Sequence, residues 1–147
     1  MAKLDELQAT IRRTERRLKE RTQDDKIVQK LLDQEGVGLV TATTLRAEIG
    51  RFDRFRTGKQ LARFCSVTPR NASSGARQAD AGLIRAGNPE LRRVLIETAC
   101  RLKWQSDHWS DFNERMKERG KAPCVVTAAI ANRWIRALYY EMRNTVA

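Results

Sequence analysis

The chain has 147 residues, of which 41% are hydrophobic and 32% are charged, and its formal net charge at pH 7 is +11. This length suits about one ordinary domain with a buried core. No apolar run approaches the roughly 20 residues that a membrane-spanning helix needs, and the charged N-terminus lacks the apolar core of a signal peptide. We therefore expect a cytoplasmic protein with no membrane partner.

Positive charge is concentrated in the middle of the chain. Residues 36–103 hold thirteen basic and five acidic side chains, whereas residues 1–35 hold nine and eight, and residues 104–147 hold seven and five. A concentrated positive field attracts polyanions and releases their counterions. The distribution favours a nucleic acid as partner over a merely solvated basic surface.

Metal-binding and disulfide patterns are not found in the sequence. The cysteines Cys65, Cys100 and Cys124 are far apart, odd in number and without C-x-x-C spacing, so we expect small buried side chains. The single histidine, His108, gives no basis for a His-pair metal site or a Ser-His-Asp triad. We expect no metal or cofactor in this chain.

Residues 2–33 are predicted to form one long helix because they contain neither glycine nor proline. Apolar residues recur in them at the spacing of a short coiled-coil seam, at Leu4, Leu7, Ile11 and Leu18. The seam would pair with another copy of the chain or pack on its own domain, and the sequence leaves both open.

Residues 34–147 are predicted to form a helical domain. Helices are expected over 39–49, 58–65, 89–105, 107–120 and 123–143. The signals for them include the stop at Gly50, the cap at Thr57 and the start at Asn88-Pro89. No segment shows sustained strand alternation, so the predicted fold class is all-α, a long N-terminal helix followed by a small helical bundle. Residues 66–87 are rich in glycine and polar residues and are predicted to be one long irregular, functional loop.

Residues 31–49 have the pattern of a helix-hairpin-helix. Gly36-Val37-Gly38 follows apolar Leu31 and Leu32, and the small Ala42 lies on the next helix. Glycines at Gly36 and Gly38 let a turn approach a phosphate closely, and the following helix N-terminus adds its positive dipole end. Such a hairpin would hold the DNA backbone without recognising its sequence. The alternative is a plain tight turn between two core helices.

A basic stretch follows the hairpin, and Asp53 is the one acidic residue between positions 51 and 77. Its cations are Arg51, Arg54, Arg56, Lys59, Arg63, Arg70 and Arg77. The phenylalanines among them are expected in the core, whereas the cations are candidates to contact phosphates.

The predicted loop contains Ser73-Ser74-Gly75, close in sequence to Arg70, Arg77 and Arg85. A serine nucleophile needs exposure, activation and nearby charge stabilisation, and a cationic setting would suit attack on a phosphodiester. On the residues alone, an ordinary turn is the alternative.

Taken in order, these motifs resemble the C-terminal transposase domain of the IS-one-ten family, which includes the Piv/MooV-type transposases and DNA invertases. The resemblance covers Leu31 to about Ala99. The matching residues are Gly36-Val37-Gly38, Thr41 to Leu45, Ala47 to Phe52, Arg54-Phe55, Lys59 to Ala62, Pro69-Arg70, Ser73-Ser74-Gly75, Gly82, Ile84, Gly87-Asn88, Leu91-Arg92-Arg93 and Leu95.

The resemblance implies a division of labour. In this family the C-terminal domain supplies a serine that attacks DNA, and an acidic ribonuclease-H-like N-terminal domain binds magnesium. Members also use a structured non-coding RNA and act as oligomers with a composite site. The serine motif falls on Ser73, with Ser74 as the fallback, and Arg92 and Arg93 are expected to contact phosphate or RNA. The acidic domain has no counterpart here, so the chain is expected to be the C-terminal part of a longer transposase and inactive alone.

We therefore expect part of a DNA recombinase in which Ser73 attacks a phosphodiester and Arg70 and Arg77 stabilise the developing charge. One alternative is a non-catalytic module that binds nucleic acid through the hairpin and the basic stretch. Another is an oligomerisation piece that acts through the N-terminal helix.

Overall fold

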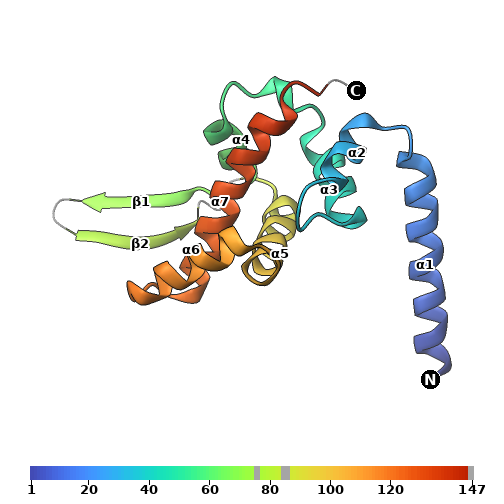
Figure 1. Ribbon diagram of the computed structural model, residues 1–147, viewed down its shortest axis with the longest axis horizontal. Helices are drawn as coiled ribbons and strands as arrows, with labels where there is room; N and C mark the ends of the chain where they lie inside the picture. Colours follow the sequence, from blue (N-terminus) through green and yellow to red (C-terminus); the bar gives the residue numbers. More distant parts are fainter. Residues whose placement is uncertain (75–76, 84–86, 146–147) are drawn as a thin grey trace.

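A computed structural model describes residues 1–74, 77–83 and 87–145, and for 70–74 and 77–82 the description is confined to the backbone. The described residues form seven α-helices, one 3-10 turn and one antiparallel hairpin (Figure 1). The elements are α1 (Ala2–Thr22), α2 (Lys26–Leu32), α3 (Leu39–Ile49), η1 (Phe52–Arg54), α4 (Gly58–Phe64), β1 (Pro69–Ser74), β2 (Arg77–Leu83), α5 (Pro89–Gln105), α6 (Asp107–Glu118) and α7 (Pro123–Met142). The predicted all-α class is confirmed for the body of the molecule.

The single helix expected over residues 2–33 is two helices instead. Asp25 stands between α1 and α2, and its Oδ1 accepts hydrogen bonds from the backbone N–H groups of Ile27 and Val28, at 3.0 and 3.1 Å. Its Oδ2 accepts from Arg46 Nε of α3, at 2.7 Å. Ile27 and Val28 are completely buried. The break therefore lets α2 join the core while α1 stays outside it.

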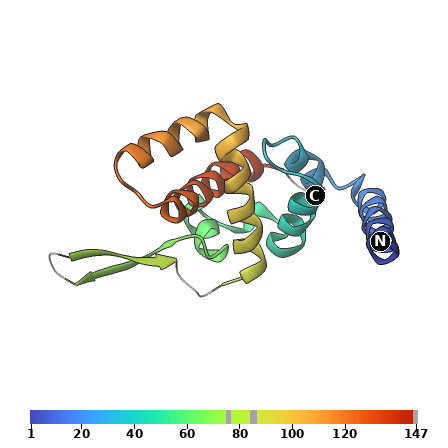
Figure 2. The same ribbon diagram turned by 90° about the horizontal axis from the view of Figure 1, so that it is seen from below.

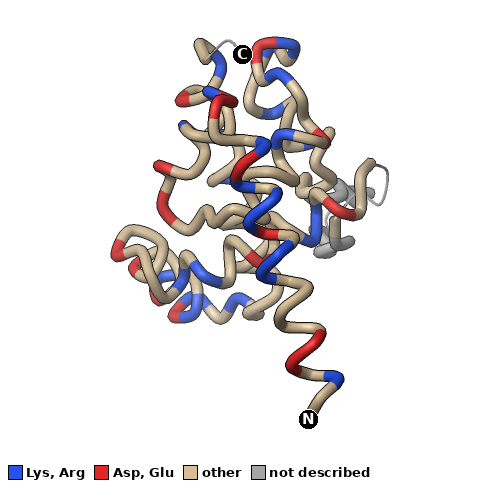
Figure 3. The backbone as a smooth tube through the Cα atoms, turned by 90° about the vertical axis from the view of Figure 1, so that its right-hand side faces the viewer, with Lys and Arg blue, Asp and Glu red and all other residues tan. Residues whose placement is uncertain are grey.

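Helix α1 contacts α3 and has no buried residue. The seam residues Leu4, Leu7 and Ile11 are 59, 58 and 48% exposed. Basic and acidic residues alternate along the rest of the helix, which extends beyond the body (Figure 3). The helix is thus no core element of this chain, and the coiled coil stays a prediction.

Residues 66–87, expected to be an irregular loop, contain a β-hairpin that projects from the helices (Figures 1 and 2). We call β1 and β2 together the arm. Its register pairs Pro69 with Leu83, Asn71 with Asp80, Ala72 with Ala79, Ser73 with Gln78 and Ser74 with Arg77. The sequence did not predict these strands because they consist mainly of small and polar residues without an alternating apolar face.

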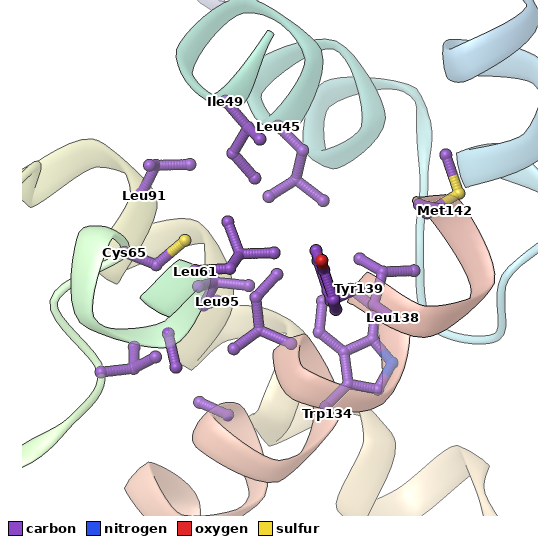
Figure 4. Close-up of a cluster of buried hydrophobic side chains, with 14 of the residues drawn as sticks. Leu45, Ile49, Leu61, Cys65, Leu91, Leu95, Trp134, Leu138, Tyr139 and Met142 are labelled. Atoms are coloured by element: carbon purple, nitrogen blue, oxygen red, sulfur yellow. The ribbon is translucent and has the colours of Figure 1, made fainter. Parts of the chain in front are cut away.

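The hydrophobic core forms around α7, which packs against α4 and α5. Leu61 of α4, Leu95 of α5 and Leu138 of α7 converge in it (Figure 4). Tyr139 is also buried there, and its hydroxyl donates a 2.7 Å hydrogen bond to the carbonyl of Phe55. Although α7 has 20 residues, no helix in the described part of the chain is long and apolar enough to cross a membrane.

The three cysteines are free thiols, but only Cys65 is buried as expected. Burial raises the pKa of the Cys65 thiol to about 12, against the smaller opposing effect of Arg54. This thiol therefore stays protonated at neutral pH. Cys100 of α5 and Cys124, in the first turn of α7, are exposed.

Candidate nucleic-acid interface

Gly36, in the turn between α2 and α3, is held against α5. Its φ is +78°, and a Cβ built on it would lie 2.8 Å from Cδ2 of Leu102. Its carbonyl accepts hydrogen bonds from Arg101 Nε and a terminal guanidinium nitrogen, at 3.3 and 3.2 Å. Arg101 also donates to Thr41 Oγ1, at 3.1 Å. Packing and backbone conformation therefore explain why this position is glycine.

Gly38 is in a different situation. It is exposed, its φ is −95°, and a Cβ added there would meet nothing within 4 Å. It is the N-cap of α3, and no side chain caps the helix. Backbone N–H groups at a helix start are donors for an anion. Gly38, rather than Gly36, is the glycine that is open to a phosphate.

The cations of the basic stretch after α3 differ in whether an acidic partner balances their charge. Arg51 is bound to Asp53 through two hydrogen bonds, one of them 3.0 Å long from Nε. The hydrogen bond from Arg51 holds the pKa of Asp53 below its usual range. The guanidinium of Arg54 lies 4.6 and 4.7 Å from the ring centroids of Phe55 and Phe64. Cation–π stacking fixes its position without neutralising its charge.

The other cations predicted to contact nucleic acid also differ in whether they have a partner within the chain. Arg56 and Lys59 are exposed and form no salt bridge within the described residues. Arg93 pairs with Glu90 at 3.0 Å and with Glu97 at 2.9 Å, so its charge is balanced locally. Arg92 donates from Nε to the carbonyl of Ser66, at 3.2 Å.

The turn and the basic stretch are not brought together. Gly38 precedes α3 and Arg51 follows it, so the 11 residues of this helix separate them. At 1.5 Å per residue, the separation is about 16 Å. A ligand that contacts both would have to be extended, as a nucleic-acid backbone is.

The candidate serines lie near the far end of the arm (Figure 2). In register, Ser73 is opposite Gln78 and Ser74 is opposite Arg77. Successive strand residues alternate between the two faces of a sheet, and directly paired residues share a face. Ser73 and Ser74 thus belong to opposite faces, and Arg77 belongs with Ser74. Arg70 lies on β1, and Arg85 is outside the described residues.

The described residues do not offer a magnesium site. Across residues 1–74, 77–83 and 87–145, no group of three histidine, cysteine or acidic residues is placed to hold a metal ion. Divalent magnesium prefers carboxylate oxygens in near-octahedral geometry. Any magnesium in the reaction would have to be held by residues outside this set.

One basic surface was not predicted. Arg115 of α6 and Arg133 and Arg136 of α7 line a groove between these helices, together with Trp109 and Tyr140. The signal in the sequence is the spacing of Arg133, Arg136 and Tyr140, which places them on one helix face. Only the packing of α6 against α7 shows that this face borders a groove.

Comparison with known proteins identifies the family. Residues 28–119, from α2 to the end of α6, match the family described as Transposase IS116/IS110/IS902 family. The chain belongs to this family. It is 33% identical over 142 residues to the probable family 20 transposase of Pseudomonas aeruginosa, a match that covers 92% of this chain and 41% of that protein. It is 29% identical over 130 residues to the transposase for insertion sequence element IS1328 of Yersinia enterocolitica, covering 86% and 39%.

The family confirms the resemblance found in the sequence, and the matched range contains the hairpin turn, the basic stretch and the arm. The chain spans about two fifths of the length of these two transposases. Helix α7, which forms one side of the unpredicted groove, follows the range that the family match covers.

Proposed function

We propose that this chain is the C-terminal part of a DNA transposase, that it binds nucleic acid, and that it supplies a serine nucleophile for strand cleavage and exchange. The observation that carries the proposal is the position of Ser73 and Ser74 near the end of a projecting arm in a member of a transposase family. A serine on such an arm can reach a phosphodiester held outside the helical body.

The chemistry exchanges one phosphate ester for another. Ser73 Oγ forms a bond to phosphorus as the bond from phosphorus to a deoxyribose oxygen breaks. The serine gives up its proton, and the departing oxygen takes one up. Attack by the hydroxyl of another strand reverses the step. Because the ester is retained, rejoining needs no nucleotide cofactor.

Arg70 and Arg77 are the candidates to stabilise the charge that develops on the phosphate. Arg77 is paired in register with Ser74, which is a specific reason to keep Ser74 as the second candidate nucleophile. In this proposal the body contributes phosphate contacts through Gly38, Arg54 and Arg56.

The proposed reaction needs components outside this chain. Because the described residues contain no cluster suited to a metal, magnesium would belong to an acidic ribonuclease-H-like domain outside this chain. A structured non-coding RNA and further copies of the transposase are the other expected partners. A projecting arm suits a composite site, since it can enter the acidic domain of another subunit.

The test is a covalent trap. The chain is mixed with an acidic family domain, Mg²⁺, the cognate RNA and end-labelled DNA that carries a recombination junction, and the products are separated on a denaturing gel. We expect a labelled protein–DNA adduct that disappears with Ser73→Ala and persists with Ser74→Ala. The reverse pattern would transfer the role to Ser74, and an adduct that survives both substitutions would overturn the serine mechanism.

A second candidate function is a nucleic-acid-binding module without catalysis. The exposed cations Arg54 and Arg56 and the open helix start at Gly38 favour it. In that case strand exchange would survive Ser73→Ala, and the double variant Arg54→Gln/Arg56→Gln would abolish DNA binding in a native gel.

A further inference from the structure

Helices α6 and α7 border a groove of about 780 Å³ that begins at Pro69, the first residue of the arm. None of the residues that line it is acidic. Among the residues whose side chains are described, neither Gly38 nor any cation of the basic stretch lines it, and its walls are α6 and α7 (Figure 1). The proposed function has so far assigned it no role.

Helix α6 separates its charges between two faces. Its exposed carboxylates recur every three or four residues, at Asp107, Asp111, Glu114 and Glu118, and so share one face of the helix. The residues that line the groove, His108, Trp109, Phe112 and Arg115, occupy other positions around the helix. The acidic side chains are thus directed away from the groove.

Helix α7 contributes a row of basic and aromatic side chains to the groove. Arg133, Arg136 and Tyr140 line the groove at helical spacing, and the small side chains of Ala129 and Ala137 on the same helix line it too. The opposite face of α7 carries the buried core residues. The groove is therefore formed on the solvent side of a core helix.

Arg133 in the groove is held in position but not neutralised. The guanidinium of Arg133 lies 4.7 Å from the ring centroid of Phe112. In the described part of the chain, Arg115, Arg133 and Arg136 form no salt bridge. A guanidinium that is stacked on a ring keeps its N–H edge free for a phosphate.

Aromatic rings lie beside these cations. Tyr140 lines the groove and is 54% exposed, and the guanidinium of Arg143 lies 5.2 Å from its ring centroid. Trp109 is half-buried and meets the ring of Phe112 edge to face, with centroids 6.0 Å apart. Cations that follow a backbone, combined with ring faces on which bases stack, are the features of single-strand binding.

We propose that the α6–α7 groove binds single-stranded DNA, with Arg133 and Arg136 on successive phosphates and Tyr140 stacked on an unpaired base. The identity of the bound strand rests on the proposed function: it would be the strand that the serine cleaves. The two sites are close enough for this, because β1 leads from Pro69 at the groove to Ser73 over about 13 Å, at 3.3 Å per residue. The groove would hold the strand a few nucleotides from the bond that the serine attacks. A duplex keeps its bases stacked and offers Tyr140 no free face.

The test measures binding of the full chain to a fluorescently labelled ten-nucleotide deoxyadenosine strand by anisotropy at several salt concentrations. We expect Arg133→Gln/Arg136→Gln to weaken binding at least tenfold. It should also lower the slope of log K against log salt by about 1.4, since each phosphate contact with a single strand contributes about 0.7. The matched control, Lys117→Gln/Arg119→Gln, removes the same charge from α6 and its C-cap outside the groove and should leave both quantities within about twofold.

The contribution of the ring is measured separately. Tyr140→Ala should weaken binding of the deoxyadenosine strand about tenfold and leave an abasic strand of the same charge unaffected, while Tyr140→Phe should bind as the unmodified chain does. Equal losses in the groove variant and in its control would overturn the groove as a site. A ten-nucleotide adenosine RNA strand is measured in the same way, and tighter, Tyr140-dependent binding of this RNA would overturn the assignment to DNA. If the Ser73-dependent adduct forms equally well in the groove variants, the groove proposal is overturned and the serine mechanism is retained. If the groove binds DNA as expected but no adduct forms, the serine mechanism is overturned and the groove proposal is retained.

Discussion

The helical body and the arm are built from different kinds of residue. The body is held by large buried side chains such as Leu61, Leu95 and Ile130. Between Pro69 and Leu83 the sequence offers only alanine as an apolar residue. The hydrophobic effect scales with the apolar area that is buried, so the body must supply nearly all the stability. The residues of the arm contribute little to the stability of the fold, which indicates that they serve another purpose.

The largest expected effect on stability lies in the body. Leu95→Ala should lower the free energy of unfolding by about 2–5 kcal/mol, because it removes a completely buried side chain and leaves a cavity. Ser73→Ala in the arm should change it by less than about 0.5 kcal/mol. Urea denaturation followed by circular dichroism measures both. Comparable losses in the two variants would contradict the division between body and arm.

Within the body, the two glycines of the turn are expected to differ in whether they serve folding or DNA binding. Gly36→Ala should cost about 1–3 kcal/mol, because it places a Cβ at positive φ and against Leu102. Gly38→Ala should cost less, about 0.5 kcal/mol, since its backbone is extended and the space around it is open, and alanine is only a poorer N-cap than glycine. It should nevertheless weaken DNA binding several-fold, because the methyl group would obstruct the start of α3. A destabilised Gly38→Ala with unchanged DNA binding would assign this glycine to folding as well.

A smaller effect depends on pH at the junction of α1 and α2. Burial alone would raise the pKa of Asp25, but the hydrogen bonds from Arg46 and from the backbone of Val28 and Ile27 outweigh it and lower the pKa below 3.8. A lowered pKa in the folded state means that the stabilisation is present above about pH 4 and is lost as the pH falls through the folded value. Asp25→Asn keeps an N-cap residue but removes the charge.

We therefore expect Asp25→Asn to be less stable than the unmodified chain by about 0.5–1 kcal/mol at pH 7. The gap should close as the pH falls below about 4 and through the lowered pKa of the folded state. Thermal unfolding at pH 7 and at a series of acidic pH values measures it. A gap that stays constant would mean that the charge of Asp25 contributes nothing to the fold.

Local signals in the sequence predicted most of the helix ends. Asn88-Pro89 starts α5 as expected, with the Asn88 side chain accepting from the N–H groups of Glu90 and Leu91, and Gly50 ends α3 at a φ of +72°. These signals are confined to a few neighbouring residues. The break at Asp25 combines a local cap, to the N–H groups of Ile27 and Val28, with a hydrogen bond from Arg46, which is 21 residues away. Only the second of these has no local signal.

The candidate site was predictable to a smaller extent. Charge and motif order pointed to the correct family, but they did not distinguish the clamped Gly36 from the open Gly38, or the paired Arg93 from the unpaired Arg56. The difference between the two glycines arises from contacts of Gly36 with Arg101 and Leu102, which are distant in sequence. The partners of Arg93, in contrast, are neighbours on the same helix, Glu90 and Glu97. The α6–α7 groove was missed because it requires two helices to pack, and neither helix shows it alone.

The central claim, that the body carries the fold and part of the nucleic-acid contact while the arm carries the chemistry, has one direct test. Residues 70–82 are replaced by an Asn-Gly turn, which can join Pro69 and Leu83 because they are paired neighbours. Thermal unfolding, DNA binding and adduct formation are then measured on the same preparation. The account predicts an unfolding midpoint within about 2 °C of the intact chain, retained DNA binding and no adduct. A collapsed midpoint, or an adduct formed without the arm, would contradict it.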